Sequence, residues 1–407
     1  MSILADIEVN MSVGDYFDKI IRIKDFWTES RFCKMVRTFH PVGHGAFYTE
    51  KFYDENNEQL FCAVYDCGCF EFAKKGVNAK FYQDRIDNCI KGFFKQGCQI
   101  DILFLSHLHN DHINGVKTLL EHCNVKQVVL PALEQNRVIE AILYNYIQEA
   151  DFSSSSQTFI EQLLGGKIKA AQLTEIEVLG EERENKNIVS EEGIDSKLSS
   201  GSRIVVKNGI WLYIPINIDN TKNSTLIEEL ESATSPQIKI ITQNGKVDFQ
   251  KVKEVVEKIG LKECMNIYRK VFGSEHNSYS MPVFSLFPKG DTHCHPFCHT
   301  PYGCWENCLY MGDFEAKTKY KEFKKSYETV GVDYKVVGVL QVPHHGSQNN
   351  LQHELYKRGK LCIISAGKDD KYKHPDLGVL SAIQLENSIP IIVTEDEKTK
   401  QQLQLVY

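Results

Sequence analysis

A histidine-rich hexapeptide constrains this 407-residue chain more than any other feature. Residues 107–112 read His-Leu-His-Asn-Asp-His and follow an apolar run at 102–105 that predicts the end of a buried strand. Imidazole and carboxylate groups together ligate zinc, manganese or iron. Buried without a ligand, each unsatisfied polar group would cost about 1–3 kcal/mol. The hexapeptide therefore predicts a metal site at a strand end.

Composition limits the class of protein. Hydrophobic residues make up 42% and charged residues 25%, as in globular proteins, and the net charge of −7 comes without a Lys/Arg block. General attraction to nucleic acid is therefore not expected. The 13 cysteines are scattered, and we find neither a signal peptide nor an apolar run near the ~20 residues that a membrane span needs. We expect a reduced, cytoplasmic protein without a membrane partner.

The hydrophobic pattern predicts a layered α/β fold. Strands and helices alternate through the first third of the chain. The predicted strands are 34–40, 61–65, 100–105 and 127–130, and the predicted helices are 80–96, 111–123 and 134–149. Further strands are predicted at 204–206, 211–214, 281–287, 308–313, 336–342 and 361–365. We expect one domain over 1–407, with an N-terminal extension at 1–33 and an insertion at 217–275 that is helical over 248–272.

Several other predicted strands also end in potential ligands. Asp66 closes one strand, Gly312-Asp313 closes another, and His344-His345 follows a third. A late histidine, His374, follows the strand at 361–365. A single Gly-Asp pair is commonly only a turn, whereas paired histidines at a strand end favour a site.

These motifs, in this order, resemble the metallo-β-lactamase superfamily. The finer details resemble one branch of it, the hydrolase domain of ComEC-type competence proteins and related phosphoesterases. The matching segments are Val42-Gly43-His44-Gly45, Asp66-Cys67-Gly68, Asn277-Ser278-Tyr279-Ser280, Met311-Gly312-Asp313, Val342-Pro343-His344-His345-Gly346-Ser347 and His374-Pro375. His44 replaces a glutamine that is usual in that branch. The resemblance covers roughly 34–385, without the insertion.

The resemblance implies an αββα sandwich with a two-metal site at one edge. Zn²⁺ is the expected metal, and Mn²⁺ is the alternative. By this resemblance, His107 and His109 bind one metal, Asp111, His112 and His345 bind the other, Asp313 bridges them, and Asp66 orients the loop from behind. His344 would contact the phosphate of the substrate, although its role and that of His345 stay interchangeable. Asp111 would hold the attacking water, and His374 would assist the leaving oxygen.

The expected activity is that of a metal-dependent phosphodiesterase or nuclease that uses a water activated by two metals. Its substrate would be a phosphoester, either a nucleotide or a nucleic acid. Two alternatives remain: hydrolysis of another ester or amide, as in lactamases and thioesterases, and a regulatory module that binds metal but has lost catalysis. Lysines at 317–325 would form either a solvated helix face or a surface for a phosphate backbone.

A second cluster of potential ligands lies in an elongated hairpin at 288–308. Its four cysteines would hold a separate structural zinc: Cys294, Cys298, Cys304 and Cys308. The alternative is a loop with free thiols in which Cys308 belongs to the core of a strand.

Overall fold

A computed structural model of the chain describes residues 33–69, 79–132, 139, 142–143, 172–178, 187–189, 194–206, 211–218, 224–242, 247–272, 280–287, 304–368 and 373–406. The predicted extension at 1–33 lies outside these residues except for Cys33. Of the predicted helix at 134–149, only Ile139, Ile142 and Leu143 are described, and all three are helical and buried.

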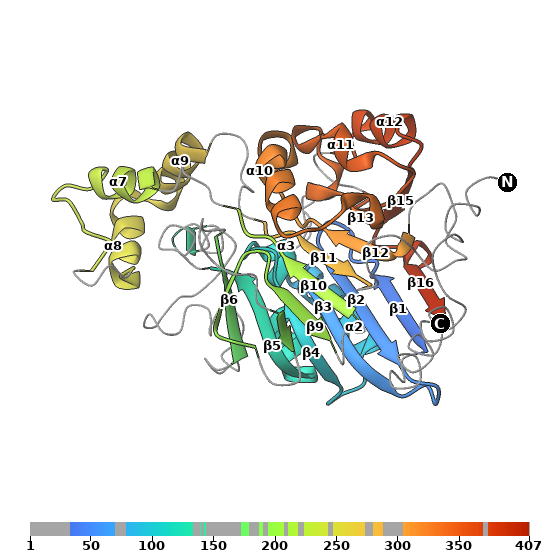
Figure 1. Cartoon of the computed structure of the whole chain (residues 1–407). Coiled ribbons are helices and arrows are strands. Elements are labelled where there is room, and N and C mark those ends of the chain that lie inside the picture. The colour runs from blue at the N-terminus through green and yellow to red at the C-terminus, as the bar shows by residue number, and fades with distance from the viewer. Residues whose placement is uncertain are drawn as a thin grey trace.

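Two sheets form the centre of the molecule (Figure 1). The strands of the first sheet, in spatial order, are β16 (Gln401–Val406), β1 (Lys34–Phe39), β2 (Phe47–Tyr53), β3 (Gln59–Cys67), β4 (Gln99–Phe104), β5 (Asn124–Pro131), β6 (Leu173–Glu177) and β8 (Lys197–Ser199). Those of the second sheet are β15 (Ile389–Val393), β14 (Leu361–Ser365), β13 (Val337–Gln341), β12 (Cys304–Tyr310), β11 (Val283–Leu286), β10 (Trp211–Pro215), β9 (Arg203–Val206) and β7 (Asn187–Val189).

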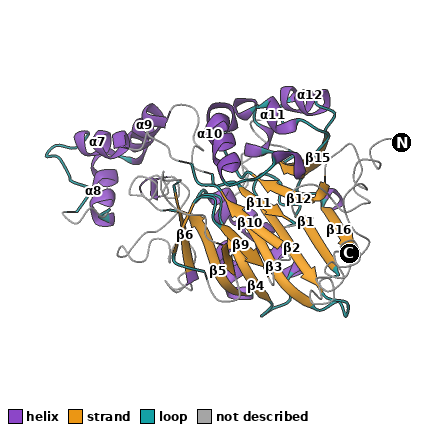
Figure 2. Cartoon of the chain, in the orientation of Figure 1, coloured by secondary structure: helices purple, strands orange, loops and turns teal. Residues whose placement is uncertain are grey.

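Helices cover the outer face of each sheet, and Figure 2 separates them from the strands. Those on the first sheet are α2 (Ala79–Phe93), α3 (Asn110–Ile113) and α4 (Val116–His122). Those on the second are α10 (Ala316–Thr329), α11 (His353–Tyr356) and α12 (Leu377–Leu385), with short 3₁₀ turns η3 (Tyr334–Val336), η4 (Pro343–Gly346), η5 (Gln348–Asn350) and η6 (Glu397–Thr399) along the chain. No helix among the described residues is long and apolar enough to cross a membrane.

Strand alternation explains the layers. In β4, Ile102 and Phe104 point into the core between the sheets, whereas Leu103 packs under the outer helices. Buried strands that face apolar layers on both sides need apolar residues at nearly every position, which is why they read as continuous apolar runs. The predicted αββα sandwich is confirmed.

The structure contains several elements that were not predicted. They include the strand β2, the strands β6, β7 and β8 in the middle of the chain, and β15 and β16 at its end. The single helix predicted over 111–123 is instead two, α3 and α4, separated at Gly115. A Cβ at Gly115 would approach the Ile86 side chain and Cys67, so the chain there passes too close to its neighbours for a larger residue.

The predicted insertion folds into α7 (Ser224–Ser232), α8 (Phe249–Ile259) and α9 (Leu261–Phe272). The last two match the helical pattern expected over 248–272, whereas α7 was not predicted. These three helices pack against one another at one side of the sandwich (Figure 1).

Candidate metal centre

The loops that follow three strands meet at one edge of the two sheets. The loop after β4 carries the hexapeptide, β12 leads to Asp313, and β13 leads to His345. One ligand atom each of Asp111, His112, Asp313 and His345 lies within 4.8 Å of the others, and all four residues are buried. The residues span more than 230 positions of the chain, so only the fold brings them together.

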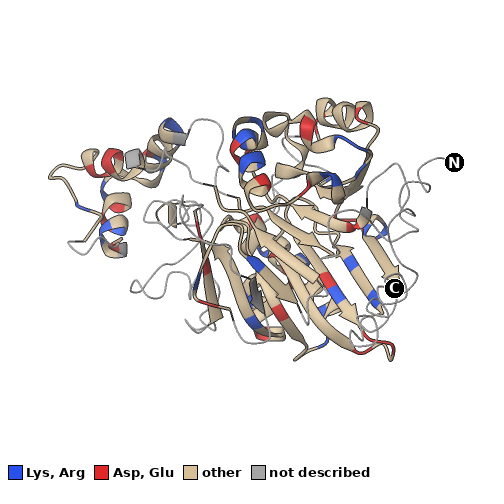
Figure 3. Cartoon of the chain, in the orientation of Figure 1, with Lys and Arg blue, Asp and Glu red and all other residues tan. Residues whose placement is uncertain are grey.

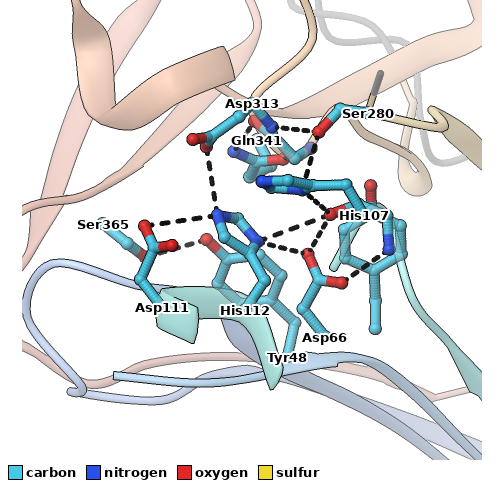
Figure 4. A network of polar contacts seen from close by, with 12 residues as sticks. Tyr48, Asp66, His107, Asp111, His112, Ser280, Asp313, Gln341 and Ser365 are labelled. Carbon is cyan, nitrogen blue, oxygen red and sulfur yellow. Dashed lines mark hydrogen bonds and ion pairs between the residues drawn. The ribbon is translucent and has the colours of Figure 1, made fainter. Parts of the chain in front are cut away.

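Asp66 fixes the ring of His112. The Asp66 carboxylate accepts hydrogen bonds from the Ser106 amide and hydroxyl, both at 2.7 Å, and lies 2.8 Å from His112 Nδ1. A carboxylate only accepts, so Nδ1 carries the proton and Nε2 keeps its lone pair. Nε2 faces Asp313 at 3.2 Å and Asp111 at 3.6 Å (Figure 4). A carboxylate behind a ligating histidine is the usual support for such a ligand.

His345 is oriented in the same way by a backbone carbonyl. Its Nδ1 donates to the Ser365 carbonyl at 2.9 Å, which leaves the Nε2 lone pair 3.3 Å from Asp111 and 3.6 Å from Asp313. Two lone pairs and two carboxylates thus face a common point. Such a group is stable only with a cation or protons between its members.

The ionisation behaviour of the cluster agrees with this geometry. Burial lowers the pKa of His112, but the Asp313 and Asp111 carboxylates outweigh it and raise that pKa well above its usual value. Burial alone would raise the pKa of Asp313, yet the His112 imidazole holds it well below its ordinary range. The cluster is therefore a strong binding site for positive charge.

His107 supplies an unsatisfied nitrogen beside this cluster. Its Nδ1 lies 2.9 Å from the Ser106 hydroxyl and 3.0 Å from the Ser280 hydroxyl. Its Nε2 is buried and has no hydrogen-bond partner among the described residues. Burial lowers the pKa of His107, and His112 and His109 lower it further, so the ring is neutral and its nitrogen can bind a metal. The donor set of imidazole nitrogen and carboxylate oxygen fits zinc or manganese.

The second predicted metal has a looser set of candidate ligands. The rings of His107 and His109 lie 4.5 Å apart, and His107 lies 4.2 Å from His112. Among the described residues, however, only the cluster of Asp111, His112, Asp313 and His345 brings three or more ligand atoms together. The predicted set of six residues thus divides into four that converge and two that lie beside them.

Glycines allow the loops of the centre to approach closely. Gly312 has a φ of 54°, and a Cβ there would come within 2.6 Å of the Ser106 Cβ. At Gly68, an added Cβ would overlap the Asp111 carbonyl and the His112 amide. The Gly-Asp and Asp-x-Gly motifs therefore have a steric basis, because larger residues would displace the candidate ligands.

Three residues around the centre were not predicted as site residues. Ser280 joins His107 to the Asp313 loop, since its hydroxyl also accepts from the Asp313 amide at 2.7 Å. The Gln341 side chain holds the same loop by accepting from the amides of Met311 and Gly312. The buried ring of His44 lies 3.7 Å from that of His345. Two of the three had a visible signal: His44 departs from its motif, and Ser280 ends the Asn-x-x-Ser segment, although neither was given a role.

His344 and His374 lie at the outer side of the centre. The His344 ring is 6.0 Å from His345 and 6.2 Å from His374. His374 Nδ1 lies 3.3 Å from an oxygen of Asp376. Of the two neighbouring histidines, it is His345 whose ring nitrogen reaches Asp111 and Asp313.

The four-cysteine zinc site falls largely outside the described residues, which exclude Cys294, Cys298 and the side chain of Cys304. Cys308 is buried in the core between the sheets, which is the alternative position anticipated for it. The structural zinc stays a prediction.

Comparison with known proteins supports the family resemblance. Residues 61–136 match the family model described as the metallo-beta-lactamase superfamily. Over 95 residues, the chain is 34% identical to ComE operon protein 3 of Bacillus subtilis (strain 168), a match that covers 23% of this chain and 11% of that protein. The chain thus matches only about a tenth of the length of this relative. With the two-sheet fold, these matches confirm the predicted resemblance to the superfamily.

A structural alignment with a long form RNase Z from yeast covers 96% of this chain and 39% of the RNase Z chain. The two chains are 11% identical, and the TM-score is 0.26. A likeness of this degree supports no conclusion about fold or function.

Proposed function

We propose that this protein is a metal-dependent phosphodiesterase or nuclease, and that its centre holds two divalent cations. The observation that carries the proposal is the convergence of Asp111, His112, Asp313 and His345 in one buried cluster. In this scheme Asp313 would be a ligand at both cation positions, and His107 and His109 would complete the position beside the cluster. Buried carboxylates of this kind persist in a fold where bound cations compensate them.

Bound divalent cations would lower the pKa of a water molecule and stabilise the charge that grows on a reacting phosphate. The residues of this chain would orient the reactants. Asp111 is ionised, because the His112 ring overcomes the effect of burial and lowers the carboxyl pKa. Its carboxylate is therefore an acceptor that can hold the attacking water by a hydrogen bond.

His344 would contact the phosphate as a neutral donor. Burial lowers the pKa of His344 to about 4, so its ring is uncharged at neutral pH. The Asn350 amide nitrogen lies 2.7 Å from its Nδ1, and an amide nitrogen only donates, so Nδ1 is the acceptor. The proton of the ring must then sit on Nε2, which can donate to a non-bridging oxygen of the phosphate.

His374 would assist the leaving oxygen. Its Nδ1 lies 3.3 Å from Asp376, a carboxylate that favours a proton on that nitrogen. When the ring is doubly protonated, the opposite nitrogen would deliver its proton to the departing alkoxide and leave the neutral imidazole. Hydrolysis of a lactam or thioester is the rival chemistry, and the His-His-Gly-Ser segment favours the phosphodiester by resemblance.

A substrate panel tests the proposal. Protein reconstituted with Zn²⁺ or Mn²⁺ is offered bis-p-nitrophenyl phosphate, single- and double-stranded DNA, RNA, cyclic nucleotides and nitrocefin. We expect hydrolysis of phosphodiesters and none of nitrocefin. Turnover of nitrocefin alone would favour the lactamase alternative. Inactivity on every substrate, with metal bound, would favour a regulatory module.

A further inference from the structure

The helix α10 has one apolar face and one basic face. Its buried residues include Ala316, Tyr320, Phe323 and Tyr327, which pack on the second sheet. Lys317, Lys321, Lys324 and Lys325 are exposed and follow the i, i+4, i+7, i+8 spacing of one stripe. We call these four residues the lysine stripe, and its charges appear as the blue bands on α10 in Figure 3.

Little in the described structure neutralises this stripe. α10 carries five lysines and two glutamates, although the whole chain has a net charge of −7. Lys324 pairs loosely with Glu328 at 3.8 Å. The other three lysines have no ion-pair partner among the described residues. A basic helix face on an acidic protein concentrates positive potential locally, where a polyanion would be attracted.

A cavity continues the stripe beyond the end of α10. It has a volume of about 550 Å³, and Lys324 belongs both to its lining and to the stripe. Lys335, Lys357 and Arg358 add further positive charge. The lining also includes three carboxylates. Glu328 and Glu354 pair with lysines, and Asp333 accepts a hydrogen bond from the Lys335 amide. Lys335 and Arg358 have no ion-pair partner within the described part of the chain.

The other end of the stripe lies at the metal centre. α10 begins at Ala316, three residues after Asp313. Its 14 residues extend about 21 Å at the ordinary helical rise. We propose that the lysine stripe and the cavity bind the phosphate backbone of a nucleic acid strand and lead it to the metal centre. This inference rests on the proposed function, because a nucleic acid is the phosphodiester that is long enough to use both.

A polynucleotide fits this surface better than an acidic polypeptide does. Its phosphates carry charge at regular, short intervals, and lysines bind them without reading sequence. The stripe offers point charges on a helix face, so binding would depend on charge and be strongly sensitive to salt.

Binding of a fluorescent 20-nucleotide single strand, in EDTA to prevent cleavage, tests the inference. We compare the full-length protein with the variant Lys317→Gln/Lys321→Gln/Lys324→Gln/Lys325→Gln by anisotropy at several salt concentrations. We expect the variant to bind at least tenfold more weakly at 100 mM salt. The slope of log K against log salt should fall in magnitude by about 2–3, since each phosphate contact contributes about 0.7.

A matched control changes four lysines of the helical insertion instead: Lys253→Gln/Lys258→Gln/Lys262→Gln/Lys270→Gln. This control should bind as the wild type does, and melting curves should show that both variants are folded. A wild type that binds no strand would overturn the inference, and so would equal affinity and slope in the α10 variant. Competition by poly-L-glutamate as effective as that by unlabelled DNA would also overturn it. Hydrolysis of bis-p-nitrophenyl phosphate by the wild type separately decides the proposed function.

Discussion

The Asp66 carboxylate lies 2.8 Å from His112 Nδ1 and thereby presents the Nε2 lone pair of His112 to Asp111 and Asp313. The same carboxylate binds the amide and hydroxyl of Ser106, the residue just before the hexapeptide. One buried side chain on β3 thus orients the loop that follows β4. The cluster of Asp111, His112, Asp313 and His345 therefore depends on a carboxylate that lies outside it.

Asp66→Asn should weaken metal binding while the fold persists. An amide nitrogen facing Nδ1 would move the imidazole proton to Nε2, where the lone pair is needed. We expect a loss of about 10–100-fold in zinc affinity, measured by competition with a chromogenic chelator. Asp101→Asn is the control, because Asp101 is a β4 carboxylate that binds the Cys62 amide and Lys126 away from the centre. Equal zinc affinity in both variants would contradict the role of Asp66.

Gly68→Ala should impair catalysis more than folding. The added methyl group would overlap the Asp111 carbonyl and the His112 amide, so the ligand loop must shift. Overpacking of this kind costs about 1–3 kcal/mol, and a displacement near 1 Å can reduce a rate by about 100-fold. Gly92→Ala on α2 meets nothing within 4 Å and should leave activity unchanged. Melting curves of the two variants measure the effect on stability, and phosphodiester hydrolysis measures the effect on catalysis. Wild-type turnover in Gly68→Ala would show that the loop tolerates the methyl group.

Lys360 should make stability depend on pH. It is fully buried, donates to the Val337 carbonyl at 2.7 Å, and burial lowers its pKa to about 8. Since its ordinary value is 10.5, the unfolded chain holds this proton more tightly between pH 8 and 10.5. Wild-type stability should therefore rise relative to Lys360→Met across that window, by up to about 3 kcal/mol.

Urea unfolding of both proteins from pH 7 to 10 measures their free energies of unfolding. Subtracting one from the other cancels the titration of the groups that the two proteins share. Lys398→Met, at an exposed position, should show no such trend. A difference between wild type and Lys360→Met that stays constant with pH would mean that Lys360 titrates normally in the folded protein.

The predicted structural zinc can be tested by elemental analysis. If Cys294, Cys298, Cys304 and Cys308 bind it, the purified protein should hold more than two zinc ions per chain. Cys294→Ser/Cys298→Ser should then lose one equivalent. Two or fewer zinc ions in the wild type would count against the site. The burial of Cys308 in the core between the sheets is a separate observation against it.

Residues that follow apolar strands were the easiest to predict. The hexapeptide and the Gly-Asp and His-His pairs each end a strand that is buried on both faces, so periodicity and ligand type indicated the same edge. Ser280 is 173 positions from its partner His107, and no local pattern connects them.

The strand β2 was not predicted because it contains a buried charged residue. Glu50 is 2% exposed and binds Arg37, Tyr213 and Tyr310 between the sheets. A charged residue in the middle of β2 reads as solvent-facing unless its partners are known, and those partners lie on other strands.

The central claim is that Asp111, His112, Asp313 and His345 hold a divalent metal on which phosphodiester hydrolysis depends. The most direct test measures bis-p-nitrophenyl phosphate turnover by chelator-treated protein, before and after addition of Zn²⁺ or Mn²⁺. We predict that metal restores turnover in the wild type, and that a folded Asp313→Ala variant stays inactive. Turnover that survives complete metal removal, or that Asp313→Ala retains in full, would contradict the account.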